Sequence, residues 1–168
     1  MRPSLSASAI HCGICLLLTG ALAMLLREPL LIPAVGGSVY MLLTAPEHEA
    51  SAPKNVLVGH GLGAAIGWLV LVLFGLRGVP GGQMAALTWT RVAAIATSLA
   101  LTNAALRATR CSHAPAGAST MIVSIGGLPE AHHILDFELA ALVTVVYAIV
   151  AHRFSGVEYP ARRARGSA

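Results

Sequence analysis

The feature of this sequence that most constrains its fold is a series of long apolar runs that carry almost no charge. Of its 168 residues, 56% are hydrophobic and 11% are charged, and the mean hydropathy is +0.75. Soluble domains carry about 25% charged residues, so the composition argues against an ordinary soluble domain. Inside a bilayer, backbone N–H and C=O groups must bond within their own segment, as they do in a helix. We therefore expect an all-α polytopic transmembrane bundle, an integral membrane protein whose main partner is the lipid bilayer.

Six apolar runs define the expected elements of this bundle. Four of them approach the ~20 residues that a helix needs to cross a bilayer. We predict these four as full spans, at residues 10–26, 55–76, 88–106 and 134–151. The runs at 30–45 and 113–128 are shorter and are interrupted by proline and small residues, at 33–38 and 115–119. We expect these two to be broken segments that either cross the membrane or re-enter it.

The order long, short, long occurs twice, on either side of a turn-rich link at residues 77–85. We interpret the chain as a single transmembrane domain, 1–168, with repeat halves at about 8–77 and 86–153. If both short segments cross, the positive residues of one side are Arg2, Lys54, Arg107, Arg110 and the arginines of the tail, Arg153, Arg162, Arg163 and Arg165. Only Arg27 and Arg77 then lie opposite, with Arg91 expected to snorkel to the edge of its span. By the positive-inside rule both termini are cytoplasmic, in a bacterial inner (plasma) membrane, and the two halves are inverted copies.

The most specific polar feature is the stretch from Cys111 to Ser119, which lies between two apolar runs. Pro115 fits the first turn of a new helix and is expected to disfavour a helical conformation at Ala114. The N–H groups and positive dipole end of such a helix attract an anion. Paired short segments in corresponding halves are typical of a transporter site. We therefore expect the two proline-led helix starts to form one shared polar pocket.

The predicted substrate-binding residues are glycines that allow close backbone approach, hydroxyls, and polar groups within the apolar runs. They are Gly36, Gly37, Ser38, His60, Asn103, His113, Gly117, Ser119 and Thr120. The two histidines can carry charge or a proton, or they can be neutral groups bonded to neighbouring helices or carbonyls. Asn103 can bind substrate or bridge two helices. Gly59, Gly63 and Gly67 indicate close helix packing.

Metal, redox and nucleic-acid sites have weaker signals. Cys12 and Cys15 share a helix face, but small-residue packing is the favoured interpretation in an apolar run. An acidic and histidine-rich group opens the last span: Glu130, His132, His133, Asp136 and Glu138. It can bind a divalent metal, yet a solvated helix end is favoured. We predict no metal and no cofactor. The basic tail indicates a membrane anchor, with no nucleic-acid partner.

Three blocks of the sequence resemble the HPP family of integral membrane proteins. Residues 52–60 resemble the entry to a middle span, residues 113–124 the His-Pro-Pro-Ala-Gly-Ala signature, and residues 152–160 the closing pattern. Ala114 replaces the first proline of the signature. The resemblance implies a small helical membrane protein, and some members of the family are linked to nitrite transport.

The expected function is a membrane transporter or channel-like permease for a small inorganic anion, with nitrite as the candidate that the family implies. A non-transporting membrane scaffold or regulatory subunit is the alternative. We expect no enzyme activity, because the sequence has no nucleophile elbow, phosphate loop or zinc-protease signature. A single chain of this length has few helices with which to line a transport pathway, which makes a homo-oligomer plausible.

Overall fold

The computed structural model describes residues 5–81, 87–157 and 159. The predicted topology charges at Arg2, Arg162, Arg163 and Arg165, and part of the closing pattern, lie outside these residues. The helices are α1 (Leu5–Leu26), α2 (Pro33–Thr44), the short 3-10 helix η1 (Glu49–Ser51), α3 (Pro53–Leu73), α4 (Trp89–Ala108), α5 (Pro115–Ser124) and α6 (His133–Phe154). Throughout the described ranges the regular structure is helical, which confirms the all-α prediction.

Three helices in the described part of the chain, α1, α3 and α6, are long and apolar enough to cross a membrane. The fourth predicted full span corresponds to α4, which has 20 residues. Arg91 and Arg107, together with Asn103 and several hydroxyl residues, make α4 more polar than the other three. The structure therefore supports three of the four predicted full spans on length and apolarity.

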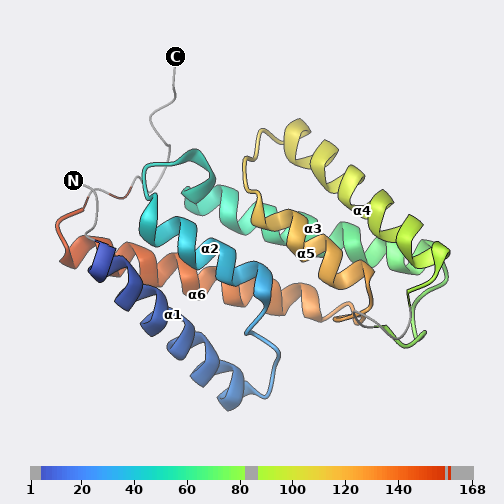
Figure 1. The fold of residues 1–168 in the computed structure, drawn as a ribbon, viewed down its shortest axis with the longest axis horizontal. Helices are drawn as coiled ribbons and strands as arrows, with labels where there is room; N and C mark the ends of the chain where they lie inside the picture. The colour runs from blue at the N-terminus through green and yellow to red at the C-terminus, as the bar shows by residue number, and fades with distance from the viewer. Residues whose placement is uncertain (1–4, 82–86, 158, 160–168) are drawn as a thin grey trace.

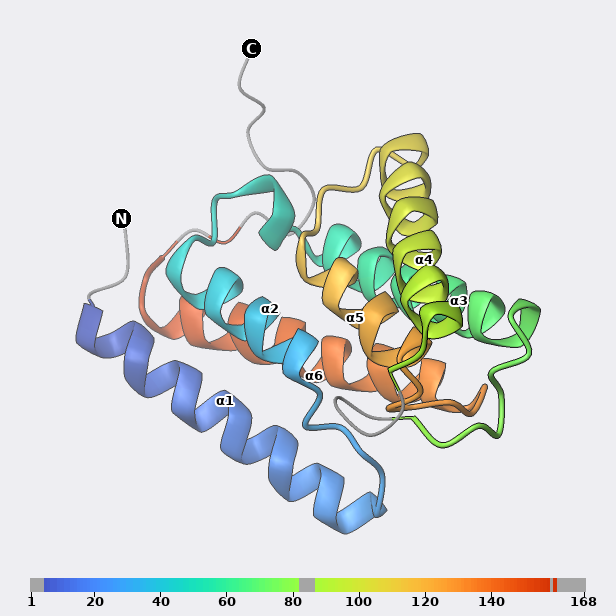
Figure 2. The same ribbon diagram turned by 45° about the vertical axis from the view of Figure 1, so that its right-hand side comes forward.

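The six α-helices form a bundle in which α2 and α5 occupy the middle (Figure 1). α1 and α4 lie on opposite outer edges, and α3 and α6 run alongside the two central helices (Figure 1, Figure 2). α5 packs against α3 and α4, whereas α2 packs against α6 and α1. α2 also touches α5, and α3 touches α6. The two short helices thus meet at the centre, each supported by a long helix.

Small side chains allow this close assembly. The face of α6 that is buried carries Ala140, Ala141, Thr144 and Ala148, and α2 contributes larger apolar residues such as Leu42 to the same core. Lipid tails are as apolar as leucine, so helix association in a membrane depends on close van der Waals packing. Small residues at the interface permit that close packing.

Proline begins three of the helices, α2 at Pro33, α3 at Pro53 and α5 at Pro115. Proline suits this position because its φ is fixed near the helical value and the first N–H has no intrahelical partner. α2 and α5 then continue through Gly36, Gly37 and Gly117 without a break. The interruption predicted inside the two segments therefore lies before each proline.

Ala114 contradicts its sequence-based prediction, because its backbone is helical, with φ −57° and ψ −38°. The carbonyl of His113 accepts the N–H of Ala116 (3.1 Å), and the carbonyl of Ala114 accepts the N–H of Gly117 (3.0 Å). These bonds close a turn that starts one residue ahead of the proline. These two backbone hydrogen bonds outweigh the steric preference of the residue before proline.

Arg91 also differs from its prediction, since its side chain is 1% exposed and does not snorkel to an edge. Its Nη2 donates to the carbonyl of Val79 at 3.3 Å, and its Nη1 lies against the backbone of Gly126. Arg91 therefore packs between the connections that follow α3 and α5. A buried guanidinium holds these two connections together at one end of the bundle.

The final described residue, Tyr159, fastens the end of the chain to the α2–α3 connection. Its hydroxyl donates to the carbonyl of Ser51 (2.5 Å), and its ring stacks on His152, whose Nε2 donates to the carbonyl of Leu42 (2.8 Å). Burial raises the pKa of the Tyr159 hydroxyl, so it stays a donor. The histidine and tyrosine of the closing pattern thus have a structural role.

Candidate functional site

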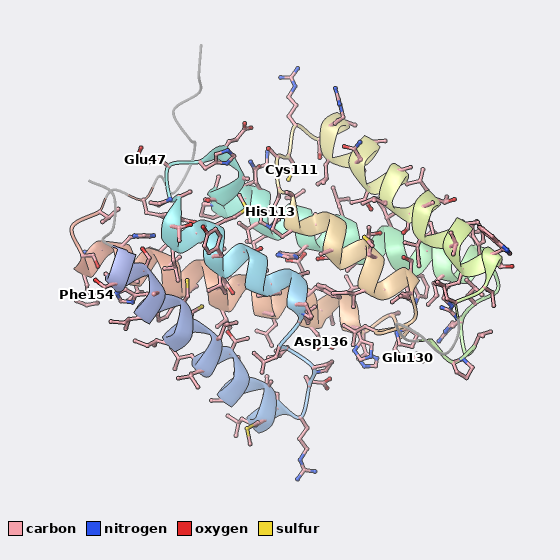
Figure 3. The ribbon with its side chains drawn as sticks, viewed as in Figure 1. Glu47, Cys111, His113, Glu130, Asp136 and Phe154 are labelled. Atoms are coloured by element: carbon pink, nitrogen blue, oxygen red, sulfur yellow. The ribbon has the colours of Figure 1, made fainter. Side chains whose placement is uncertain are left out.

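Four buried polar side chains meet where α2, α3 and α5 come together. Ser38 comes from α2, His60 from α3, His113 from the connection just before α5, and Ser119 from α5. Each is no more than 2% exposed. We call these four residues the Ser–His cluster. Figure 3 shows His113 close to the start of α5, beside the α4–α5 connection that carries Cys111.

The Ser–His cluster is a continuous chain of hydrogen bonds. Ser119 Oγ lies 2.7 Å from His60 Nδ1, and His60 Nε2 lies 2.7 Å from Ser38 Oγ. Ser38 Oγ lies 2.9 Å from His113 Nε2, and His113 Nδ1 lies 2.8 Å from the carbonyl oxygen of Ala50. The short helices α2 and α5, which are far apart in the sequence, are therefore linked through one histidine of α3.

The carbonyl at one end fixes the direction of this chain. A carbonyl only accepts, so His113 Nδ1 donates to Ala50 and the neutral ring accepts at Nε2. Ser38 then donates to His113 and accepts from His60 Nε2–H. His60 Nδ1 in turn accepts the hydroxyl proton of Ser119. Each of the four groups is satisfied, as burial in a membrane protein requires.

The two histidine rings also contact each other directly. Their Nε2 atoms are 3.3 Å apart, and the ring planes meet at 70°. Two positive charges at this separation repel strongly in a buried environment, so the pair holds at most one added proton. The histidine pair can therefore accept one proton or stay neutral. Ser38 is hydrogen-bonded to both rings.

Glycines of α3 make the short distances in this cluster possible. A Cβ on Gly59 would lie 2.9 Å from Cβ of His113, and one on Gly67 would lie 2.7 Å from the carbonyl oxygen of Thr120. A Cβ on Gly63 would overlap the carbonyl oxygen of Ala116. The three glycines bring α3 against α5, which confirms the packing interpretation of their spacing.

The α4–α5 connection is held against the start of α3 by two contacts. His113 bonds to the carbonyl of Ala50, and Cys111 Sγ donates to the carbonyl of Asn55 at 3.3 Å. Burial raises the pKa of the Cys111 thiol, so it remains protonated and able to donate. These contacts place His113 at the inner end of the connection, where it reaches Ser38.

A cavity of about 900 Å³ lies between α4 and the start of α5. Its polar lining consists of Glu49, Thr102, Asn103, Arg107, Arg110, Ser112 and His113. Two guanidinium groups against one carboxylate give it a positive balance. His113 belongs both to this wall and to the Ser–His cluster, so it connects the cavity with the buried chain of hydrogen bonds.

Two threonines of α4 and α5 hold hydroxyls without a hydrogen-bond partner. Thr102 Oγ1 on α4 and Thr120 Oγ1 on α5 are both buried. Such groups are uncommon, because an unsatisfied buried hydroxyl costs about 1–3 kcal/mol. Thr102 belongs to the cavity wall, but its hydroxyl oxygen is itself buried.

The remaining predicted site residues have different positions. Asn103 and Gly117 line the cavity, and a Cβ on Gly37 would lie 3.5 Å from Cγ of Pro115, an ordinary contact. A Cβ on Gly36 would meet nothing within 4 Å, so no other segment packs closely against this glycine. Ser38 and Ser119 lie beyond the first turn of their helices, so free N–H groups do not surround them, contrary to expectation.

Sequence reasoning missed two contributors to this region. The carbonyl of Ala50, which fixes the tautomer of His113, belongs to η1 and has no sequence signal. Arg107 and Arg110 were interpreted as topology charges only, yet they line the cavity. Their position just ahead of Cys111 and His113 was the signal that could have placed them here.

Cys12 and Cys15 are free thiols of α1, with Cys15 in the apolar core.

The comparison with known families matches residues 3–160 to the family described as HPP, transmembrane region. This match covers nearly the whole chain. The chain belongs to the HPP transmembrane-region family. The His-Ala-Pro-Ala-Gly-Ala stretch, residues 113–118, thus coincides with the connection and helix start that supply His113 to the Ser–His cluster. No curated protein and no solved structure matches the chain.

Proposed function

We propose that this HPP-family protein is a membrane permease for a small inorganic anion, with nitrite as the first candidate. The observation that carries the proposal is the double position of His113. It lines a cavity with a positive balance, and it bonds to Ser38 in the buried centre of the bundle. A transport protein needs such a connection between an accessible cavity and polar groups at its core.

The lining of the cavity suits an anion. Arg107 and Arg110 attract negative charge, and the amide of Asn103 can donate hydrogen bonds. A small, nearly flat anion such as nitrite fits these donors more easily than a cation does. The carboxylate of Glu49 in the same wall lowers the net positive charge of the cavity, which favours release of the anion.

Protonation supplies a way to open the cluster. A proton added to His60 at Nδ1 makes that ring a donor on both sides, so Ser119 becomes an acceptor. The hydroxyl hydrogen of Ser119 is then free to donate elsewhere, for instance to an anion. Because the resulting charge on His60 also attracts the anion, proton and anion enter the centre together.

The proposal includes an inverted repeat of α1–α3 and α4–α6. If α1 is exchanged with α4, α2 with α5 and α3 with α6, each principal contact between two of the six α-helices becomes another contact that the structure also has. Contacts α1–α2 and α4–α5 then correspond, as do α3–α5 with α6–α2 and α3–α4 with α6–α1. Contacts α2–α5 and α3–α6 correspond to themselves. The crossing of α2 and α5 lies near the axis of exchange, as in transporters with repeats.

In this arrangement the two short helices cross the membrane with the help of their non-helical connections. Both termini are then cytoplasmic in a bacterial plasma membrane, on the side of Lys54, Arg107 and Arg110. Asn103 is exposed on α4. A polar side chain facing lipid is unfavourable, so a second copy packed on α4 would cover it and complete the cavity wall.

Uptake of nitrite by proteoliposomes tests the proposal. We expect uptake above that of empty vesicles, stimulated by an inward proton gradient, and a reduction of at least tenfold in His113→Ala and Ser119→Leu. Gly13→Ala in α1, outside the predicted site, is the matched control, because a Cβ there meets open space. No uptake by the parent protein would refute the proposal, provided that size-exclusion chromatography shows it folded.

A scaffold or regulatory subunit is the second candidate, and one observation favours it. The four groups of the Ser–His cluster satisfy one another without any guest. A purely structural network has this property. Absence of uptake, together with a stable membrane partner recovered by affinity purification, would support this function.

A further inference from the structure

The start of α6 and the α1–α2 connection bring together four groups that are typical metal ligands. Glu28 follows α1, and His132, His133 and Asp136 lie at the beginning of α6. One ligand atom from each residue lies within 4.8 Å of all the others. Glu28 is remote in the sequence from the other three, so folding alone assembles the group. We propose that they form a binding site for a divalent transition metal, Zn²⁺ being the ion that fits best.

The chemistry of the four groups is that of a zinc site. Two imidazole nitrogens and two carboxylate oxygens are common Zn²⁺ ligands, usually in tetrahedral geometry. Two carboxylates and two neutral imidazoles carry a charge of −2, which one divalent ion neutralises. A nearby acid, Glu130, does not share this charge, because it pairs with Arg77 at 3.3 Å.

The geometry needs only side-chain adjustment. Neighbouring ligand atoms around a tetrahedral zinc are about 3.3 Å apart, given bonds of ~2.0–2.1 Å. His133 Nδ1 and Asp136 Oδ2 are already 2.8 Å apart, and the rings of His132 and His133 have centroids 4.2 Å apart. His132 is exposed and Glu28 is partly exposed, so both side chains can rotate toward an ion.

The backbone around Glu28 is shaped to direct it toward α6. Arg27 has φ +59°, a left-handed conformation that non-glycine residues rarely adopt. It ends α1 with a tight reversal in which the N–H of Glu28 donates to the carbonyl of Ala23 (3.1 Å). Leu30, fully buried, then anchors the connection in the core. Glu28 is therefore held in place on both sides.

The expected consequence of metal binding is a clamp between α1 and α6. α1 lies at the edge of the bundle and leaves most of its apolar surface outside (Figure 2). A metal that joins Glu28 to the start of α6 would fasten the C-terminal end of α1 to the rest of the molecule. Figure 3 shows Asp136 away from His113, so this site is separate from the Ser–His cluster.

The test is Zn²⁺ binding by the full chain in detergent, purified with an affinity tag that lacks histidine and stripped with EDTA. Isothermal titration with Zn²⁺ should give one site per chain. Glu28→Gln and His132→Ala should each weaken binding at least tenfold. Glu130→Gln and His48→Ala, an exposed acid and an exposed histidine outside the site, should change it less than twofold.

A thermal-unfolding measurement gives a second readout. Zn²⁺ at a fixed concentration that saturates the wild-type protein should raise its Tm by several degrees and should raise the Tm of Glu28→Gln by clearly less, because stabilisation by a ligand that binds the native state falls as its affinity falls. Absence of saturable binding, or equal binding by Glu28→Gln, would overturn the proposal. Ser119→Leu should bind Zn²⁺ normally, so this result is independent of the uptake assay.

Discussion

His60 is the single residue on which the centre of the bundle depends most. Its two ring nitrogens reach Ser38 on α2 and Ser119 on α5, each at 2.7 Å. The ring also lies 6.4 Å from that of Phe137 on α6, nearly parallel to it. One side chain of α3 thereby contacts three other helices. A histidine is suited to this position because its two nitrogens can donate on one side and accept on the other.

Replacing His60 by alanine should therefore destabilise the protein. Ser38 keeps His113 as a partner, but Ser119 retains only a long contact of 3.5 Å to the carbonyl of Pro115. Loss of packing and of a buried partner together should lower the free energy of unfolding by about 2–4 kcal/mol. Reversible unfolding in mixed micelles measures this change. Leu17→Ala, at an exposed position of α1, should differ from wild type by less than about 0.5 kcal/mol. Equal stability of the two variants would show that the bonds of His60 contribute little.

At the scale of helices, the pairing of α3 with α5 determines whether the site can form. α5 has only 10 residues, so it is too short to be stable alone and depends on packing. The glycine face of α3 provides a groove in which the backbone of α5 lies. Because the cluster bonds are shorter than 3 Å, a small separation of these helices would break them.

Gly63→Ala should test this pairing. Its Cβ would overlap the carbonyl oxygen of Ala116, and backbone cannot move aside as a flexible side chain can. Overpacking of this kind costs about 1–3 kcal/mol, and we expect nitrite uptake to fall in parallel. Unfolding experiments and the uptake assay measure both effects.

Gly36→Ala is the control for helix propensity, because it adds a methyl group to open space in α2. It should be neutral or stabilising by up to about 1 kcal/mol, since alanine favours helix over glycine. If both variants behaved alike, the close approach of α3 and α5 would not limit stability.

At the scale of the whole molecule, the bundle has two ends with different loops. The α2–α3 and α4–α5 connections belong to one end, with the start of α1 and the end of α6 (Figure 1). The α1–α2, α3–α4 and α5–α6 connections belong to the other. Arg77 and Glu130 pair at this second end, and Arg91 holds its connections together.

Thiol labelling should detect this sidedness. In a background without Cys12, Cys15 and Cys111, a cysteine placed at Glu47 should react with an impermeant maleimide only from the cytoplasmic side. A cysteine placed at Arg77 should react from the opposite side, since α3 crosses between them. Intact cells and inverted membrane vesicles provide the two comparisons. Labelling of both positions from the same side would refute six crossings.

The sequence by itself determined the elements of this protein. Long uncharged runs require helices in a membrane, Pro33 and Pro115 mark two helix starts, and glycines four residues apart indicate a close helix partner. These are local properties of the backbone and of nearby side chains, so a single sequence contains them. The boundaries of the two short helices were less well predicted. Proline was expected to interrupt these segments, but it also occurs as the first residue of a helix.

Only the tertiary structure decided which polar groups meet. Ser38, His60, His113 and Ser119 were each singled out, yet their order in one chain of hydrogen bonds depends on how α2, α3 and α5 cross. The open space beside Gly36 likewise follows from packing, and the proximity of Glu28 to His132, His133 and Asp136 was overlooked because these residues lie far along the chain. Distances of this kind are set by the packing of whole helices, and no local pattern records them.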